Sequence, residues 1–155
     1  MNHAHYAALE EACENILPLS PHYTNRPIDE GFDWSPLDGV PFEQLYLVVF
    51  RSTRRQDADV DLLREHDDRA YEEAQRLGGL LLYFKGIPNE RRECLSFCLW
   101  ETREQAVRAA AGSSHGRAAE ISYRTYERYD LERYDVLKEN GNVQFRPVGP
   151  LAHAS

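Results

Sequence analysis

The sequence predicts an α+β domain with the ferredoxin-like order β-α-β-β-α-β, in which a four-stranded antiparallel sheet carries two helices on one face. Three observations support this prediction. Four strand-like runs lie between residues 42 and 138, two segments among them have helical spacing of apolar residues, and turn sequences separate these elements. We therefore divide the chain into an N-terminal helix with a proline-rich arm at 1–40, the ferredoxin-like domain at 41–140 and an irregular tail at 141–155.

The composition is that of one folded domain. The chain has 155 residues, 42% of them hydrophobic, and a net charge of −8. Because phosphate contacts require clustered Lys and Arg, this charge disfavours nucleic acid and anionic membranes as partners. No apolar run is long enough to span a bilayer, and we expect no signal peptide at the N-terminus. The cysteines Cys13, Cys94 and Cys98 form no CxxC pair, so we expect reduced thiols in a cytoplasmic protein.

The first 40 residues differ from the rest of the chain. Residues 7–17 have helical spacing of apolar side chains. Residues 18–41 contain five of the eight prolines, together with the aromatic residues Tyr23, Phe32 and Trp34. Proline fixes φ and removes a backbone donor, which favours an extended arm. The aromatic residues indicate that this arm packs on another part of the molecule.

The first strand and the first helix of the domain follow the arm. Residues 42–53 are rich in β-branched and aromatic residues and predict a strand buried on both faces. Residues 57–79 predict a helix that Asp57 or Asp59 caps and that ends at Gly78. Apolar and small residues recur along this helix at spacings of three and four, and they predict one inward stripe: Leu63, His66, Ala70, Ala74 and Leu77.

Three further elements complete the predicted order. Residues 79–86 and 93–101 predict two strands that a short turn joins, which makes them antiparallel. Thr102 is placed to cap a second helix, which is interrupted near Gly112. Residues 126–138 predict the fourth strand.

One face of the predicted sheet has no partner within the subunit. Two helices cover the other face, whereas residues 42–53 and 79–86 are apolar on both sides. A large exposed apolar surface is typical of an interface. We therefore expect a homodimer in which two protomers pack sheet to sheet through the open face.

Two short sequences carry a resemblance to a known family. The element order, the sequence LWETREQA at 99–106 and the sequence SSHGRA at 113–118 resemble antibiotic biosynthesis monooxygenase-like domains of the dimeric α/β-barrel superfamily. The resemblance covers residues 43–138. It implies a pocket inside each protomer, between the sheet and its two helices. The activities it implies include cofactor-free oxygenation and cyclisation of aromatic polyketides, haem degradation and lactone isomerisation, and some members bind haem through a histidine.

Two departures from the family narrow these activities. Haem-degrading relatives have a His on the second helix and a Trp ten residues before it, and this chain has Ala119 and Ala109 at those positions. Polyketide-cyclising relatives combine a Tyr with the histidine that corresponds to His115, and this chain has Ala109 in place of that tyrosine.

Two histidines are the candidate catalytic residues. His115 lies in the sequence SSHGRA, and His66 lies on the predicted inward stripe of the first helix beside small alanines. Imidazole titrates near neutral pH, so a histidine in a pocket can act as a general base without a cofactor. The structural alternatives are a histidine that bonds a backbone carbonyl where the helix restarts, and a core histidine with one satisfied hydrogen bond.

Aromatic and basic residues on the strands are candidate substrate-binding residues. Tyr46, Tyr83, Trp100 and Tyr126 can form the walls of a site for a flat substrate. Either Arg51 or Lys85, near the ends of apolar strands, can pair with a substrate carboxylate. Each aromatic residue also has a structural alternative in the core or at an interface. No metal site is expected, because the charged residues of the sequence REHDD point around a helix and do not converge.

The predicted function is a cofactor-independent enzyme, similar to a monooxygenase, that acts on a small aromatic or polyketide-like substrate by histidine general-base catalysis. One alternative is a polyketide cyclase or isomerase of the same fold. The other is a non-catalytic protein that binds a small ligand, which includes haem. The expected partners are a small-molecule substrate and a second copy of the chain.

Overall fold

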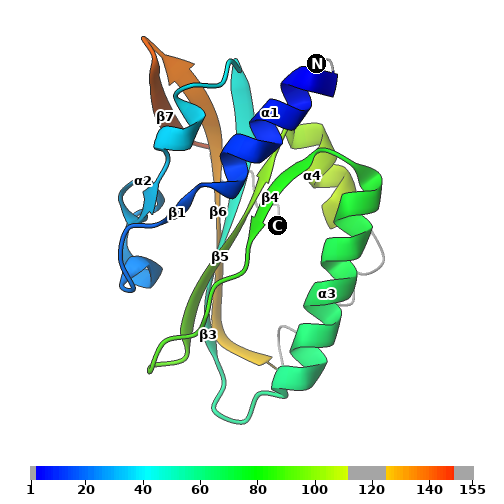
Figure 1. Cartoon of the computed structure of the whole chain (residues 1–155). Helices are drawn as coiled ribbons and strands as arrows, with labels where there is room; N and C mark the ends of the chain where they lie inside the picture. Colours follow the sequence, from blue (N-terminus) through cyan, green and yellow to red (C-terminus); the bar gives the residue numbers. More distant parts are fainter. Residues whose placement is uncertain (1–2, 112–124, 149–155) are drawn as a thin grey trace.

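The computed structural model describes residues 3–111 and 125–148 and confirms an α+β fold (Figure 1). The larger sheet is antiparallel and has five strands in the order β4-β5-β3-β6-β7. These strands are β3 (Gln44–Arg54), β4 (Leu80–Phe84), β5 (Glu93–Trp100), β6 (Tyr126–Glu139) and β7 (Asn142–Pro147). On one side of the sheet lie two helices, α3 (Val60–Leu77) and α4 (Arg103–Ala110). The elements from β3 to β6 follow the predicted β-α-β-β-α-β order.

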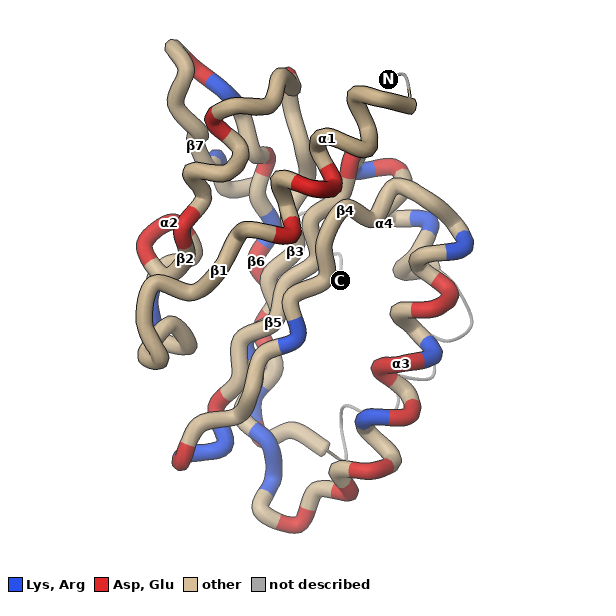
Figure 2. The backbone as a smooth tube through the Cα atoms, in the orientation of Figure 1, with Lys and Arg blue, Asp and Glu red and all other residues tan. Residues whose placement is uncertain are grey.

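Capping residues set the ends of both helices. The Asp59 side chain accepts a backbone hydrogen bond of 3.0 Å at the start of α3, and Gly78, with a φ of 84°, follows its last residue. Thr102 and Gln105 form a reciprocal capping box at the start of α4. Figure 2 shows acidic and basic positions following one another along α3. None of the helices within the described ranges is long and apolar enough to cross a membrane. The expected continuation of the second helix lies outside the described residues.

The N-terminal arm covers the face of the sheet that α3 and α4 leave open. In Figure 1 this blue-to-cyan segment lies on the opposite side of the sheet from α3. It consists of α1 (His3–Glu14), β1 (Leu17–Pro18), η1 (Tyr23–Asn25), α2 (Ile28–Gly31), β2 (Phe32–Asp33) and η2 (Ser35–Leu37). The Phe32 ring lies 5.0 Å from the Phe84 ring and 5.1 Å from the Phe97 ring, measured between centroids. The arm and the sheet therefore share one aromatic core.

Two cations on the sheet hold the arm by its backbone. Lys138 Nζ on β6 donates hydrogen bonds of 2.6–2.9 Å to the carbonyl oxygens of Leu37, Asp38 and Val40. Arg51 on β3 donates to two further carbonyl oxygens of the arm. Hydrogen bonds from charged donors are stronger than neutral ones, so these contacts fix the path of the arm over the sheet.

The prediction of an open sheet face is wrong. Leu47, Val49 and Leu99 on that face are 0% exposed within one chain, because the side chains of the arm pack against them. A second protomer cannot reach these residues while the arm is in place. The aromatic residues of the arm supply the apolar surface that we expected a partner sheet to supply, so the reason for a homodimer through this face no longer holds.

The prediction of an irregular tail from residue 141 is also wrong. Asn142–Pro147 forms β7, which pairs antiparallel with β6 and extends the predicted four-stranded sheet to five strands. Asn140 and Gly141 join the two strands with φ angles of 52° and 80°. A two-residue loop with both φ angles positive is the hairpin turn that Asn-Gly favours. This pair of residues is therefore the sequence signal that the prediction overlooked.

Candidate active site

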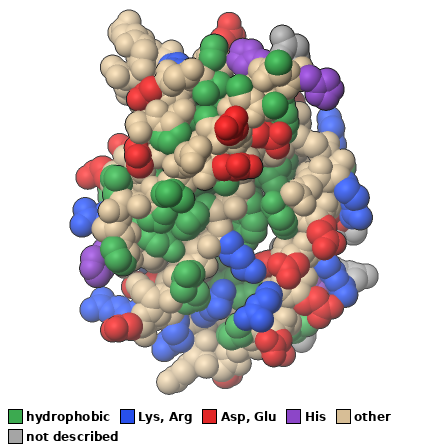
Figure 3. Space-filling view, in the orientation of Figure 1, with side chains coloured by type: hydrophobic (Ala, Val, Ile, Leu, Met, Phe, Trp, Pro, Cys, Tyr) green, Lys and Arg blue, Asp and Glu red, His purple; other side chains and the backbone are tan. Residues whose placement is uncertain are grey.

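A cavity of about 130 Å³ lies between α3 and the face of the sheet that α3 covers. Alternate residues of β3 and β5 form its floor: Phe50, Ser52, Cys94, Ser96 and Cys98. α3 forms the opposite wall through residues at helical spacing: Asp67, Ala70, Tyr71 and Ala74. Figure 3 shows a hollow with hydrophobic side chains inside it, and Lys and Arg side chains near its border. The two alanines leave space that larger side chains would fill.

Two pairs of tyrosine side chains, from different elements, line the cavity. The ring centroids of Tyr71 and Tyr83 lie 5.3 Å apart, and those of Tyr126 and Tyr129 lie 5.1 Å apart. Burial raises the pKa of Tyr83, Tyr126 and Tyr129, and the charge of Asp67 raises it further. These phenols therefore stay protonated at neutral pH, and they can donate hydrogen bonds to the oxygens of a flat ligand.

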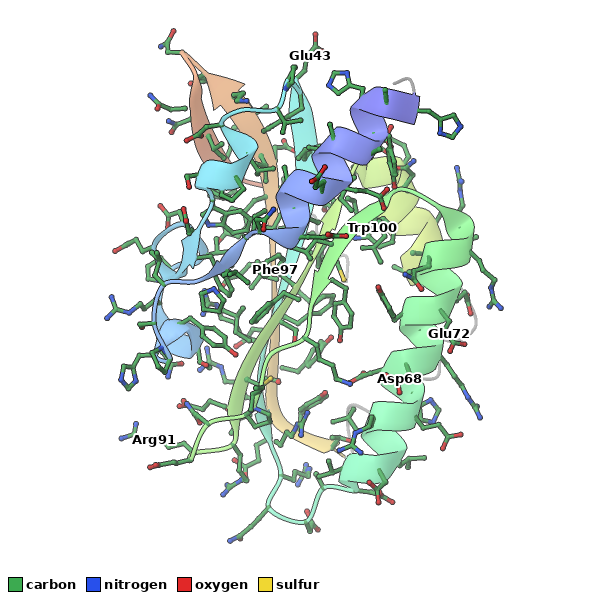
Figure 4. All side chains as sticks on the ribbon, in the orientation of Figure 1. Glu43, Asp68, Glu72, Arg91, Phe97 and Trp100 are labelled. Atoms are coloured by element: carbon green, nitrogen blue, oxygen red, sulfur yellow. The ribbon has the colours of Figure 1, made fainter. Side chains whose placement is uncertain are left out.

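Asp67 is the acidic residue among the described residues that line the cavity. Burial raises the pKa of its carboxyl group, whereas the charges of Lys85 and Arg54 lower it to a smaller extent. A carboxylate in such a position can accept a proton from a bound molecule. The next residue, Asp68, is labelled on α3 in Figure 4. It is exposed, and its Oδ1 lies 3.6 Å from Lys85 Nζ.

Gly86 brings the end of β4 close to β5. A Cβ atom at this position would lie 1.9 Å from the Leu95 carbonyl oxygen, so no other residue fits without a shift of the backbone. The Gly86 N–H donates a hydrogen bond of 3.0 Å to Ser96 Oγ on the cavity floor. This close approach holds Lys85, the preceding residue, at the border of the cavity.

The two cysteines on the cavity floor are neutral thiols. Burial raises the pKa of the Cys98 thiol to about 12, and it also raises the pKa of the Cys94 thiol. The thiolate is the nucleophilic and metal-binding form of cysteine, so neither residue is activated for these roles. Within residues 3–111 and 125–148, no three His, Cys, Asp or Glu side chains lie together as a possible metal site.

Three of the five predicted substrate-binding residues line the cavity, namely Tyr83, Trp100 and Tyr126. Trp100 is labelled in Figure 4, on the side of the sheet that faces α3 and α4. Tyr46 also lies on this side, but it packs in the small core beside Trp100 and is 4% exposed. Tyr46 is not among the described residues that line the cavity.

The prediction for Arg51 requires a correction, because this residue lies on the arm side of the sheet. Its Nε lies 2.6 Å from a Glu132 carboxylate oxygen. Its Nη1 and Nη2 donate hydrogen bonds of 2.8 Å to the carbonyl oxygens of Thr24 and Arg26. Successive residues of a strand point to opposite faces, so Arg51 cannot reach the cavity, whereas Arg54 lines it.

Neither candidate catalytic histidine is among the described residues around the cavity. His115 lies outside the described residues. His66 is half-buried on α3, and the next residue, Asp67, lines the cavity instead. The inward stripe of α3 is therefore rotated relative to the predicted one. The prediction missed Asp67 because it took the charged residues of REHDD to point around the helix without a common site, although Ala70 and Tyr71 follow Asp67 at helical spacing.

Solved structures show the class of fold to which this protein belongs. Its structure is similar to a proposed antibiotic biosynthesis monooxygenase from Nitrosomonas europaea, with a TM-score of 0.51 and 9% identity over 64% of this chain and 95% of that chain. It is also similar to Rv0793 from Mycobacterium tuberculosis, with a TM-score of 0.54 and 16% identity over 62% and 98% of the two chains. A third similar structure is SnoaB, a cofactor-independent oxygenase from Streptomyces nogalater, with a TM-score of 0.50 and 9% identity over 65% and 100%. The predicted resemblance to antibiotic biosynthesis monooxygenase-like domains is confirmed, and at these identities it concerns the fold.

The sequence also matches a family over almost its whole length. Residues 2–147 match the family described as PB2B2.08-like, and the chain belongs to this family. It is 30% identical to UPF0643 protein PB2B2.08 of Schizosaccharomyces pombe over 156 residues, which cover 88% of this chain and 71% of that protein. The matched residues include both the arm and the ferredoxin-like domain.

Proposed function

We propose that this protein is a cofactor-independent enzyme, similar to a monooxygenase, that removes a proton from a small aromatic or polyketide-like substrate. The observation that carries this proposal is the position of Asp67. Its desolvated carboxylate lies at a cavity with aromatic walls and protonated phenols. The monooxygenase-like fold supports the same proposal.

The cavity offers the groups that such a proton transfer requires. The aromatic side chains hold a flat ring. The phenols of Tyr83 and Tyr126 donate hydrogen bonds to the substrate oxygens, and these bonds stabilise the negative charge that develops when the substrate loses its proton. Asp67 is the general base that accepts the proton. The resulting electron-rich carbanion then reacts with oxygen or closes a ring.

The two predicted histidines remain candidates for the base. His115 keeps this role from the family resemblance, and His66 adjoins Asp67 on α3. The reaction needs one general base, and Asp67, His66 and His115 are the three candidates. Substitution of each residue in turn therefore identifies the base. The base is the residue whose loss abolishes turnover while ligand binding persists.

The first prediction concerns Asp67→Asn, tested with anthrone as the probe. Anthrone has an acidic CH₂ group between two rings, and with one O₂ it forms anthraquinone and one water. Loss of the general base is expected to reduce kcat/KM by about 10²–10⁴-fold. Oxygen uptake and the absorbance of anthraquinone measure the rate. The matched control is Glu72→Gln, an exposed position on the same helix that Figure 4 labels, which is expected to leave the rate unchanged.

The remaining outcomes separate the alternatives. An unchanged rate in Asp67→Asn, together with a loss in His115→Ala or His66→Ala, contradicts the role of Asp67 and assigns the base to that histidine. Turnover of a polyketide-like probe without oxygen uptake favours a cyclase or isomerase. Ligand binding without turnover in the unmodified protein favours the non-catalytic alternative, and a Soret band on titration with haem identifies haem as the ligand.

A further inference from the structure

We infer that the substrate of this site carries an anionic group, such as a carboxylate, which binds Arg54 and Lys85 where the aromatic cavity meets a second cavity. This inference rests on the proposed function, because it places the aromatic part of the same substrate in the tyrosine-walled cavity. It adds the substrate class, namely an aromatic acid or a polyketide-like acid.

A second cavity of about 220 Å³ adjoins the first one. The two cavities share Arg54, Asp67, Lys85 and Gly86 among their lining residues. The second cavity lies between the start of α3 and the segment after β4, and it is also lined by Arg64. An elongated ligand can therefore occupy both cavities and pass the shared residues.

The ratio of basic to acidic residues in the second cavity differs from that of the whole chain. Among its described lining residues, the second cavity has three basic residues, Arg54, Arg64 and Lys85, and one acidic residue, Asp67. The whole chain has 26 acidic and 18 basic residues. Basic side chains therefore outnumber acidic ones in the lining itself, although Asp68 lies near Lys85 and Asp61 lies near Arg64. Such a lining favours an anionic ligand that displaces these two carboxylates.

The side chain of Arg54 has a hydrogen-bond donor, Nε, that lacks an acceptor. Among the described residues, its Nε is the only buried side-chain nitrogen or oxygen atom without a hydrogen-bond partner. A buried donor without a partner is unfavourable, and an arginine guanidinium matches a carboxylate through two parallel hydrogen bonds. This atom is closed off from solvent, so a ligand carboxylate in the cavity would become its acceptor only after a rotation of the Arg54 side chain.

The other two basic residues are free to exchange their partners. Lys85 Nζ lies 3.6 Å from Asp68, and Arg64 Nη1 lies 3.9 Å from Asp61. The four side chains of these pairs are 42–95% exposed. Exposed ion pairs at such distances contribute little free energy, so a ligand anion can displace them at low cost.

The test compares two ligands that share one ring system and differ in charge, 2-naphthoate and 2-naphthylmethanol. Isothermal titration calorimetry measures their affinities for the full chain. We expect the unmodified protein to bind 2-naphthoate about tenfold more tightly, and Arg54→Gln to remove most of this preference while 2-naphthylmethanol binds as before. The matched control is Arg55→Gln, which removes the same charge at an exposed neighbouring position. Lys85→Gln, at a half-exposed side chain, gives a second test if Arg54→Gln fails to fold.

The outcomes separate this inference from the proposed function. Equal binding of the two ligands to the unmodified protein overturns the inference and leaves the aromatic cavity of the proposed function intact. An equal loss of both ligands in Arg54→Gln also overturns it, because the residue then supports the cavity and does not select charge. If neither ligand binds the unmodified protein, the inference and the proposed function fail together.

Discussion

At the scale of single residues, Asp67 and Asp68 show how far the environments of two adjacent carboxylates can differ. Asp67 lines the cavity, and burial raises its pKa. Asp68 lies on the exposed side of α3 and pairs with Lys85 at the border. One step along a helix turns a side chain by about 100°, which is enough to move a carboxylate from water to a cavity wall. The sequence REHDD does not reveal which of its acidic residues faces inward.

The second prediction is that Asp67→Asn stabilises the protein near neutral pH. The pKa of Asp67 in the folded protein lies above its ordinary value of 3.8, so the folded protein binds this proton more tightly than the unfolded chain does. Stability therefore falls as the pH rises from 3.8 through the folded pKa. Asparagine carries no charge and avoids this loss. Urea denaturation near pH 7 is expected to show a higher midpoint for the variant, and the difference is expected to vanish at a pH below 3.8.

The control for this prediction is Asp68→Asn. Its carboxylate is exposed, so the free energy of unfolding is expected to change by no more than about 0.5 kcal/mol. An Asp67→Asn variant that is less stable than the unmodified protein near neutral pH would contradict the prediction. It would show that the carboxylate gains more from Arg54 and Lys85 than it loses by burial.

At the scale of elements, the arm and the hairpin of β6 and β7 depend on a few residues each. The arm has little regular structure of its own, and it is held by aromatic packing and by cations that bind its carbonyl oxygens. The hairpin depends on a turn with positive φ angles. A substitution at one position can therefore test which contact or backbone angle stabilises each element.

The third prediction is that Lys138→Met destabilises the arm. The substitution removes three hydrogen bonds from a charged donor and also the contact between Lys138 Nζ and the Phe42 ring, 5.0 Å from its centroid. We expect a loss of about 2–3 kcal/mol in the free energy of unfolding, measured by urea denaturation, and faster hydrogen exchange in the arm. Arg128→Met, on an exposed part of the same strand, is the control with an expected loss near zero. Equal losses in the two variants would show that Lys138 does not hold the arm.

The fourth prediction is that Gly141→Ala destabilises the hairpin by about 1 kcal/mol. No atom lies within 4 Å of a Cβ built at this position, so the cost comes only from the φ angle of 80°. Gly39 has equally open surroundings and no positive φ, which makes Gly39→Ala a matched control with an expected change of zero or a small gain. Thermal denaturation measures both variants. A Gly141→Ala variant as stable as the control would mean that the turn does not need a positive φ.

At the scale of the whole molecule, one sheet separates two different interiors. The side that faces the arm is a filled core of aromatic and aliphatic side chains. The side that faces α3 and α4 contains a smaller core and the cavity. The arm thus closes the apolar face of the sheet, and the helices leave room for a ligand on the other face.

The fifth prediction is that the full chain sediments as a monomer of 17.9 kDa at micromolar concentration. The arm already covers the sheet face that would otherwise form the interface. Removal of residues 1–40 exposes this apolar face, and in the same sedimentation experiment it is expected to cause association or aggregation. A stable dimer of the full chain would contradict the prediction.

Much of the fold could be predicted because its signals are local. The ends of α3 and α4 follow from Asp59, Gly78 and Thr102, whose capping groups act within one helical turn. The strands follow from runs of apolar residues. The site could be predicted in part. The positions of Tyr83, Trp100 and Tyr126 at the cavity agree with the sequence pattern, because aromatic residues on strands suit the wall of a site, and their binding role stays a prediction. The inward position of Asp67 depends on the rotation of α3 against the sheet, which no sequence pattern gives.

The β-α-β-β-α-β order and the resemblance to antibiotic biosynthesis monooxygenase-like domains can be read without a structure, because periodicity, capping and short motifs depend on neighbours along the chain. Two features follow from the folded arrangement alone: the arm covers the second face of the sheet, and Arg51 faces the arm while Arg54 faces the cavity. The aromatic arm and the sheet of a second protomer are both apolar, and either could cover an open sheet face. The choice between them depends on long-range packing and on the contacts of cations with distant carbonyl oxygens, which no local pattern records.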